Sequence, residues 1–190
     1  MLLNKGAFPF FVLGVNMCGR FYFDPYIDLS KITKSIKAEQ LSLFKPGEIT
    51  PGSLALAVTT NGIQLMNWSY NLFNRKIINT RIESIRDKNF YEQDYKNNKC
   101  LVISSGFYEW DKYKKRYFIT RENTPFYLAA IYQNNSPFNN FSIITKAAEQ
   151  TKEIHDRIPI TLDKYSATKY LNNEYTIEQL ISLKQEFIIK

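Results

Sequence analysis

The sequence predicts an α+β fold with a mainly antiparallel, curved or barrel-like β-sheet and peripheral helices. Strand-length stretches rich in apolar and aromatic residues recur along most of the chain. Short turns rich in Asn, Pro and Gly separate these stretches, and tight turns favour antiparallel pairing. The spacing typical of helices is confined to a few segments near the start of the chain and towards its end. We therefore expect strands to dominate.

The first elements are a strand and a helix. Residues 19–23 predict a strand that Asp24-Pro25 breaks. Residues 27–43 have helical spacing of isoleucines with lysines between them, and Lys45-Pro46-Gly47 ends the pattern.

The middle of the chain predicts a hairpin and a series of strands. Residues 54–60 show a partial alternation of side-chain type that is typical of a strand. Asn61-Gly62 is a strong signal for a two-residue turn, and residues 63–68 are expected to form the second strand of the hairpin. Residues 100–107 form an apolar run typical of a buried strand. The remaining expected elements are strands at 117–120, 126–132 and 141–145 and helices at 147–154, 164–171 and 177–187.

Composition limits the class of protein. The 190 residues suit one domain with a substantial core, and 44% hydrophobic residues with 13 Tyr and 14 Phe exclude a disordered chain. A net charge of +7 permits a polyanionic partner, but a Lys-rich composition explains it equally well. No run reaches the ~20 apolar residues of a membrane span, so we expect a cytoplasmic protein. We also expect a monomer.

The two cysteines, Cys18 and Cys100, do not form a disulfide framework or a metal-binding pair in sequence. Cys100 opens an apolar run, where a buried free thiol is the ordinary expectation. A single histidine, His155, excludes multi-histidine metal sites, so we expect neither a metal nor another cofactor.

Residues 1–16 are interpreted as an upstream extension, and residues 17–190 as a single domain. The apolar stretch in residues 8–15 lacks the length and the small residues of a signal peptide. We expect translation to start at Met17, with a removed leader or a retained extra strand as the alternatives.

Four short motifs carry the reactive side chains. An isolated Cys is more often buried filler, an isolated His a structural residue, and a Glu beside Trp a solvated strand end, so each motif alone is a weak signal. The motifs are Met17-Cys18-Gly19-Arg20-Phe21, Asn79-Thr80-Arg81-Ile82-Glu83, Gly106-Phe107-Tyr108-Glu109-Trp110 and His155-Asp156-Arg157-Ile158-Pro159.

Together and in this order, the four motifs resemble the SRAP family, which includes bacterial abasic-site processing proteins and their eukaryotic counterparts. The resemblance runs from Met17 to about Leu162, and it takes in Thr50-Pro51-Gly52 and Trp68. Two departures stand out. The segment between Trp68 and Asn79 is shorter than in many members, and the Val-Ser-x-x-Val-Asn strand common near the family's C-terminus is absent before Lys190.

The resemblance implies that Met17 is removed and that Cys18 becomes the amino terminus. An α-amine with a pKa near ~8 is partly neutral at physiological pH and can attack the aldehyde of a ring-opened abasic sugar. The tethered thiol then closes a five-membered thiazolidine ring, helped by its high effective concentration. The expected function is therefore covalent protection of abasic sites in single-stranded DNA during the DNA damage response.

The resemblance also assigns the other catalytic residues. Glu109 is expected to act as the general acid and base, with its pKa raised by apolar neighbours. His155 is the second proton-transfer group. Asn79 is expected to position Cys18 and the opened sugar by hydrogen bonds.

Arg20 and Arg81 match arginines that bind DNA phosphates beside the lesion. Trp68 is a candidate for stacking on a neighbouring base, and a core role is an equal alternative. Asp156 and Arg157 are expected to pair and to orient His155.

Two alternative functions stay open. One is a thiol peptidase that uses Cys18 and His155, either on its own leader or on other proteins. The other is a noncovalent single-stranded nucleic-acid binder that uses basic charge and aromatic stacking.

Overall fold

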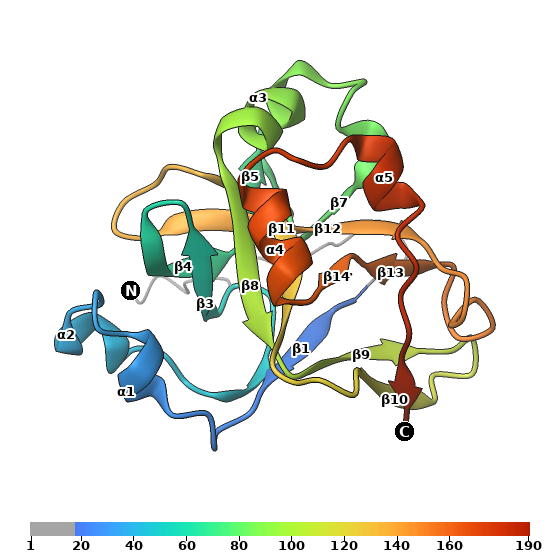
Figure 1. Cartoon of the computed structure of the whole chain (residues 1–190), viewed down its shortest axis with the longest axis horizontal. Helices are drawn as coiled ribbons and strands as arrows, with labels where there is room; N and C mark the ends of the chain where they lie inside the picture. The colour runs from blue at the N-terminus through green and yellow to red at the C-terminus, as the bar shows by residue number, and fades with distance from the viewer. Residues whose placement is uncertain (1–17) are drawn as a thin grey trace, which may run out of the picture.

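The computed structural model describes residues 18–190, so the expectation for residues 1–16 lies outside the described residues. Two β-sheets and a small hairpin make up most of this part of the chain, and short helices lie around them (Figure 1). This arrangement confirms the predicted α+β class with a mainly antiparallel, barrel-like sheet.

The first sheet is antiparallel throughout, and Cys18 lies just before one of its inner strands, β1. In spatial order its strands are β15 (Ile188–Ile189), β10 (Arg116–Thr120), β9 (Gly106–Trp110), β1 (Arg20–Phe23) and β2 (Gly47–Ile49). Side chains alternate between its two faces. Phe21 and Phe107 lie opposite each other on the buried face, while Arg20 and Tyr108 share the outer face.

The second sheet closes into a ring. Strand β12 pairs in parallel with β4 and antiparallel with β11, while β4–β3, β3–β8 and β8–β11 complete the circuit. Closure removes free sheet edges within the ring. The strands of this sheet are β3 (Leu54–Thr59), β4 (Gly62–Trp68), β7 (Asn79–Arg81), β8 (Lys99–Ser104), β11 (Phe126–Gln133), β12 (Asn139–Ala147), β13 (Arg157–Pro159) and β14 (Thr161–Leu162).

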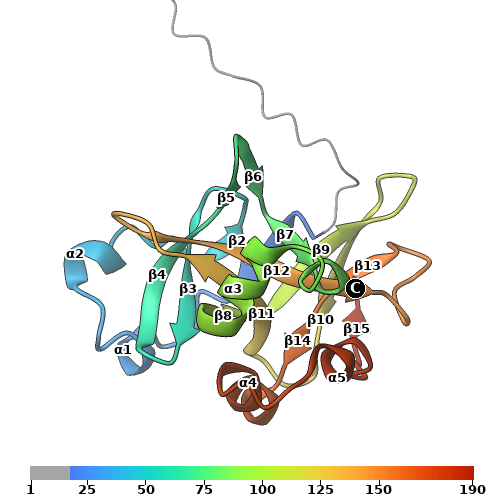
Figure 2. The ribbon, with the colours of Figure 1, turned by 90° about the horizontal axis from the view of Figure 1, so that it is seen from above.

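The remaining elements are short. A hairpin of β5 (Tyr70–Leu72) and β6 (Arg75–Ile77) projects from the sheets (Figure 2). The helices are α1 (Leu29–Ile32), α2 (Ala38–Leu41), α3 (Asn89–Asn97), α4 (Lys164–Leu171) and α5 (Ile177–Ile181), with a 3₁₀ turn at Ile82–Ser84. No helix among residues 18–190 is both long and apolar enough to cross a membrane.

A bend at Ser105 carries the chain from the ring to the first sheet. The Ser104 hydroxyl donates to the Gly106 carbonyl at 2.8 Å, and the Thr120 hydroxyl donates to the Ser105 carbonyl at 2.7 Å. The expected strand at 100–107 is therefore two strands, β8 and β9, that belong to different sheets. Glu109 lies on β9 after this bend and is buried.

Several helix expectations were wrong. Residues 27–43 form two single turns, α1 and α2, rather than one helix; the Thr33 hydroxyl donates to the Leu29 carbonyl at 2.7 Å where α1 ends. Residues 148–154 form turns rather than a helix, and the helix expected at 177–187 ends at Ile181. Helix α3 was not predicted, although Tyr91 and Tyr95 are buried on one face of it.

The helix at 164–171 and the strands expected near 19–23, 54–60, 63–68, 117–120, 126–132 and 141–145 are confirmed, with ends that differ by a few residues.

We expect Gly106→Ala to destabilise the protein by about 1–3 kcal/mol. A β-carbon at Gly106 would overlap the ring of Phe118 and would lie 3.1 Å from the Ile119 carbonyl oxygen. The measurement is the midpoint of chemical denaturation. Gly19→Ala is the matched control, because nothing lies within 4 Å of a β-carbon built there. Equal midpoints for the two variants would contradict the close packing of β9 on β10.

Candidate functional site

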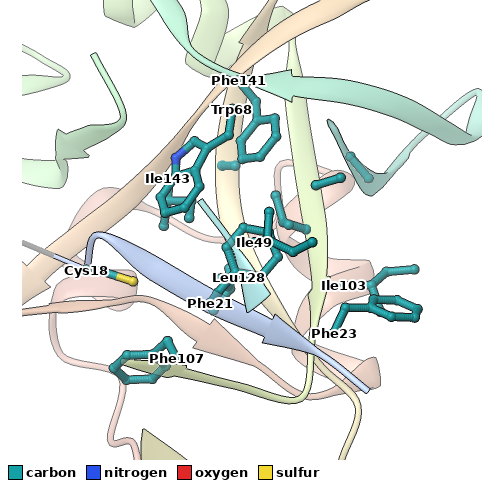
Figure 3. Packing of buried hydrophobic residues seen from close by; sticks show 14 of the residues in the cluster. Cys18, Phe21, Phe23, Ile49, Trp68, Ile103, Phe107, Leu128, Phe141 and Ile143 are labelled. Carbon is teal, nitrogen blue, oxygen red and sulfur yellow. The ribbon is translucent and has the colours of Figure 1, made fainter. Parts of the chain in front are cut away.

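Cys18 lies directly before β1 and is fully buried, with 0% of its surface exposed. Its backbone nitrogen donates a hydrogen bond to Glu109 Oε1 at 2.7 Å, across 91 positions of sequence. Figure 3 shows its sulfur directed towards the apolar cluster that contains Phe21 and Phe107. The reactive nitrogen expected from the sequence is therefore held against the carboxyl group of the third motif.

Glu109 is the buried carboxyl of the site, with 1% of its surface exposed. Its neighbours Tyr108 and Trp110 point to the outer face, so strand alternation sends Glu109 inward. Oε2 has no hydrogen-bond partner among residues 18–190. Burial raises the pKa of Glu109 to about 8, the Cys18 N–H opposes this rise, and the charge of Asp156 adds to it. Glu109 can therefore both donate and accept a proton near neutral pH.

The Cys18 thiol is held in its protonated form. Burial raises the pKa of this thiol well above its ordinary value, and the negative charge of Glu109 raises it further. The sulfur donates a hydrogen bond to the Arg20 carbonyl at 3.8 Å. A thiol in this setting is not an activated thiolate nucleophile.

Asn79 reaches the same residue from the other sheet. Its side-chain Nδ2 donates to the Cys18 carbonyl at 3.3 Å. Strand β7 holds Asn79 in place, because it pairs in parallel with β12 and sets Asn79 opposite Ile143. Cys18 is thus hydrogen-bonded to both Glu109 and Asn79.

His155 lies at the cleft that opens beside the start of β1. Its Nδ1 lies 3.1 Å from the backbone N–H of Arg157, which donates to it. Asp156 Oδ1 lies 3.0 Å from the same nitrogen. The cleft has a volume of about 790 Å³ and its lining includes Gly19, Trp110 and His155. Within residues 18–190, no recorded hydrogen bond joins His155 to Cys18.

An ion pair between the buried Arg157 and the exposed Glu83 joins the fourth motif to the second. The Arg157 guanidinium donates to both carboxyl oxygens of Glu83, each at 2.8 Å, and to the Thr145 carbonyl at 2.7 Å. The expected pairing of Arg157 with Asp156 was wrong: the Asp156 side chain is 72% exposed and lies next to His155 instead. Both residues lie within the motifs, but the sequence did not predict that Glu83 and Arg157 pair with each other.

The two expected phosphate-binding arginines are exposed. Arg20 forms an ion pair with Glu48 on the outer face of the first sheet, and Arg81 ends β7 two residues after Asn79. The cleft beside Cys18 adds positive charge that the motifs did not indicate. Its lining includes Lys112, Lys114 and Lys152.

Trp68 occupies the core rather than a surface for DNA bases. It is 0% exposed, its indole nitrogen donates to the Ile78 carbonyl at 2.8 Å, and its ring stacks on Phe141 with a centroid separation of 6.3 Å. The stacking interpretation was therefore wrong, and the core role fits. A more exposed ring is Phe73, which is 90% exposed between β5 and β6 and makes an edge contact with Phe90.

The site offers hydrogen-bonding and proton-transfer groups. Residues 18–190 contain no group of three or more His, Cys, Asp or Glu side chains that could hold a metal ion. Both cysteines are free and buried. The arrangement can hold an amine nitrogen beside a carboxyl group that carries a proton near neutral pH, with basic side chains around the opening.

Known proteins are similar to this chain at low sequence identity. The chain is 25% identical over 187 residues to the abasic site processing protein YoaM of Bacillus subtilis, which covers 84% of this chain and 81% of that protein. It is 24% identical over 187 residues to the abasic site processing protein YoqW of the same organism, covering 84% of this chain and 82% of that protein.

Solved structures share the fold. A protein from Bacteroides thetaiotaomicron matches with a TM-score of 0.65 at 21% identity, covering 84% of this chain and 81% of that one. A phage-related protein from Bordetella bronchiseptica matches with a TM-score of 0.69 at 21% identity, covering 91% of this chain and 93% of that one.

The family model described as SOS response associated peptidase (SRAP) matches residues 17–188, which include all four motifs and the site that they form. The chain therefore belongs to the SRAP family.

Proposed function

We propose that this protein traps abasic sites in single-stranded DNA through a thiazolidine formed by Cys18. The observation that carries the proposal is the 2.7 Å hydrogen bond between the Cys18 nitrogen and Glu109. Removal of the residues before Cys18 would turn this nitrogen into an α-amine that already has a proton-transfer partner. The relatives named abasic site processing proteins support the choice of substrate.

The thiazolidine forms in three steps. The neutral amine attacks the aldehyde carbon of the ring-opened sugar and gives a carbinolamine. Glu109 donates a proton to the departing hydroxyl, so that water leaves and an iminium forms. The Glu109 carboxylate then takes the proton from the nitrogen, which gives a neutral imine. The Cys18 sulfur then adds to the imine carbon while its proton passes to the nitrogen, which closes the ring. The neutral thiol favoured by burial supplies that proton.

The surrounding residues have positioning and proton-transfer roles in this proposal. The hydrogen bond from Asn79 to the Cys18 carbonyl at 3.3 Å fixes the backbone from which both reacting groups extend. His155 lines the cleft beside Gly19, where the sugar would enter, and can exchange a proton with its hydroxyl.

The geometry gives less support to the two alternative functions. A thiol peptidase needs a thiolate activated by a nearby base, whereas burial raises the pKa of the Cys18 thiol. Within residues 18–190, the imidazole Nδ1 of His155 lies against Arg157 and Asp156 rather than Cys18. A purely noncovalent binder has no need of a fully buried Cys beside a buried Glu109.

We expect Cys18→Ala to abolish a heat-stable adduct with a single-stranded oligonucleotide that carries one abasic site. Noncovalent, salt-sensitive binding should persist, because the basic side chains remain. Denaturing electrophoresis and intact mass measure the adduct, and its mass should correspond to a chain that begins at Cys18.

Cys100→Ala is the matched control, since Cys100 is the other buried free cysteine. An adduct that survives Cys18→Ala, or one whose mass retains residues before Cys18, would refute the mechanism.

We expect Glu109→Gln to slow adduct formation by about 100-fold at pH 8. In the reactive form of the wild-type protein, Glu109 is protonated and the Cys18 amine is neutral. The pKa of Glu109 is about 8, and the pKa of an α-amine is near ~8, so the two groups share one proton in this form. The wild-type rate should therefore pass through a maximum near this pH and fall on both sides. The variant has no proton to lose from residue 109, so its slower rate should only rise with pH. Single-turnover rates across a pH series test this, and a wild-type rate that rises without a maximum would remove Glu109 from its role.

The same substitution should stabilise the fold at alkaline pH. The pKa of Glu109 rises from 4.5 to about 8 on folding, so between these values the unfolded chain binds fewer protons and stability falls as pH rises. We expect Glu109→Gln to gain roughly 1–3 kcal/mol at pH 9 and little at pH 4. Both proteins should carry Cys18→Ala, so that Cys18-dependent processing cannot alter the comparison. Denaturation midpoints that differ equally at both pH values would contradict the buried carboxyl.

A further inference from the structure

Glu48 joins two arginines on the outer face of the first sheet. One of its carboxyl oxygens accepts a hydrogen bond from Arg20 and the other accepts one from Arg116. The two arginines come from β1 and β10, which are separated by β9. The hydrogen bond from Arg20 is the main reason that the pKa of Glu48 lies below its ordinary value, so this carboxylate is ionised near neutral pH.

Aromatic rings hold the Arg116 guanidinium in place. Its central carbon lies 3.7 Å from the centroid of the Tyr108 ring and 5.7 Å from that of Trp110. Strand register supports this position, because Arg116 pairs with Trp110 and Arg20 pairs with Tyr108. Stacking on a ring leaves the edge of a guanidinium free to form hydrogen bonds in a fixed direction.

Two arginine guanidinium groups that face one anion suit the binding of a phosphate group. A carboxylate between them supplies two oxygens, as a phosphate does. The ion pair adds little to stability, since the side chains of Arg20, Arg116 and Glu48 are 44%, 41% and 29% exposed. All three remain accessible to a competing anion.

The position of this cluster connects it to the reactive residue. Arg20 and Trp110 also line the cleft beside Cys18, together with Lys112 and Lys114. A strand whose sugar reaches Cys18 would therefore carry its neighbouring phosphates past the Arg20 side chain. Arg116 belongs to none of the four motifs.

We propose that Arg20 and Arg116 bind one backbone phosphate of the DNA strand, and that Glu48 occupies this phosphate position in the unbound protein. The inference rests on the proposed function for the identity of the strand. Arg116 is then a DNA-binding residue, and Glu48 is a positioning residue that keeps both arginines oriented until the phosphate displaces it.

The test measures equilibrium binding in a Cys18→Ala background, so that covalent capture does not obscure affinity. The probe is a labelled single-stranded oligonucleotide with one tetrahydrofuran abasic analogue, titrated at several salt concentrations. We expect Arg116→Gln to weaken binding about tenfold and to reduce the salt slope by about 0.7, the value for one lost phosphate contact. Glu48→Gln should strengthen binding about threefold, because it removes the competing charge. This gain should shrink when Arg116→Gln is also present.

Two controls carry the same changes of charge elsewhere. Lys34→Gln and Glu39→Gln alter exposed residues in the segment of α1 and α2, away from the cluster. If Arg116→Gln resembles Lys34→Gln in affinity and salt slope, the phosphate site is refuted. If Glu48→Gln weakens binding, its role as an occupant of that site is refuted.

The proposed function is tested separately by the adduct of the unmodified protein with a natural abasic site. Its absence, with the Arg116 effect intact, would refute thiazolidine formation and leave the phosphate site standing. Its presence, with no Arg116 effect, would refute the phosphate site alone.

Discussion

The hydrogen bond from the Cys18 nitrogen to Glu109 is the contact on which the site depends, because it joins the start of β1 to a carboxyl group that has little access to water. Water would otherwise solvate the charged form of Glu109 and keep its pKa low. The burial that raises this pKa also raises that of the Cys18 thiol. One apolar environment therefore sets the proton positions of both groups.

The rigid setting of these groups comes from contacts between distant segments. The buried Arg157 forms a bidentate ion pair with the exposed Glu83, and this pair joins the segment after His155 to the segment after Asn79. Loss of Glu83 would leave the buried guanidinium of Arg157 without its counter-charge, which is destabilising. The parallel pairing of β7 with β12 fixes Asn79 in the same region. These contacts explain why residues far apart in sequence occupy one site.

Much of this arrangement could be predicted from the sequence, for identifiable reasons. Period-two patterns and the Asn61-Gly62 turn identified the strands because both are local signals. The motifs located Cys18, Asn79 and Glu109, which do come together. The continuous helix expected at 27–43 failed because β-branched residues and side-chain hydrogen bonds end α1 after a single turn.

Other features depend on tertiary contacts that a pattern does not contain. Trp68 is a residue type that can stack on DNA bases, so the sequence alone does not decide its role. Its contacts with Phe141 and with the Ile78 carbonyl place it in the core. The pairing of Arg157 with Glu83 instead of Asp156 depends on where β7 lies beside β12. The Glu48 cluster requires β1, β2 and β10 to share one sheet.

The burial of Cys18 has a consequence for the redox chemistry of its sulfur. Peroxide and disulfides react with thiolates, and they do so at accessible sites. The Cys18 sulfur is protonated and has no exposed surface, so oxidation to a sulfenic acid or to a mixed disulfide is disfavoured. The same burial that keeps the thiol protonated therefore also lowers its reactivity towards oxidants.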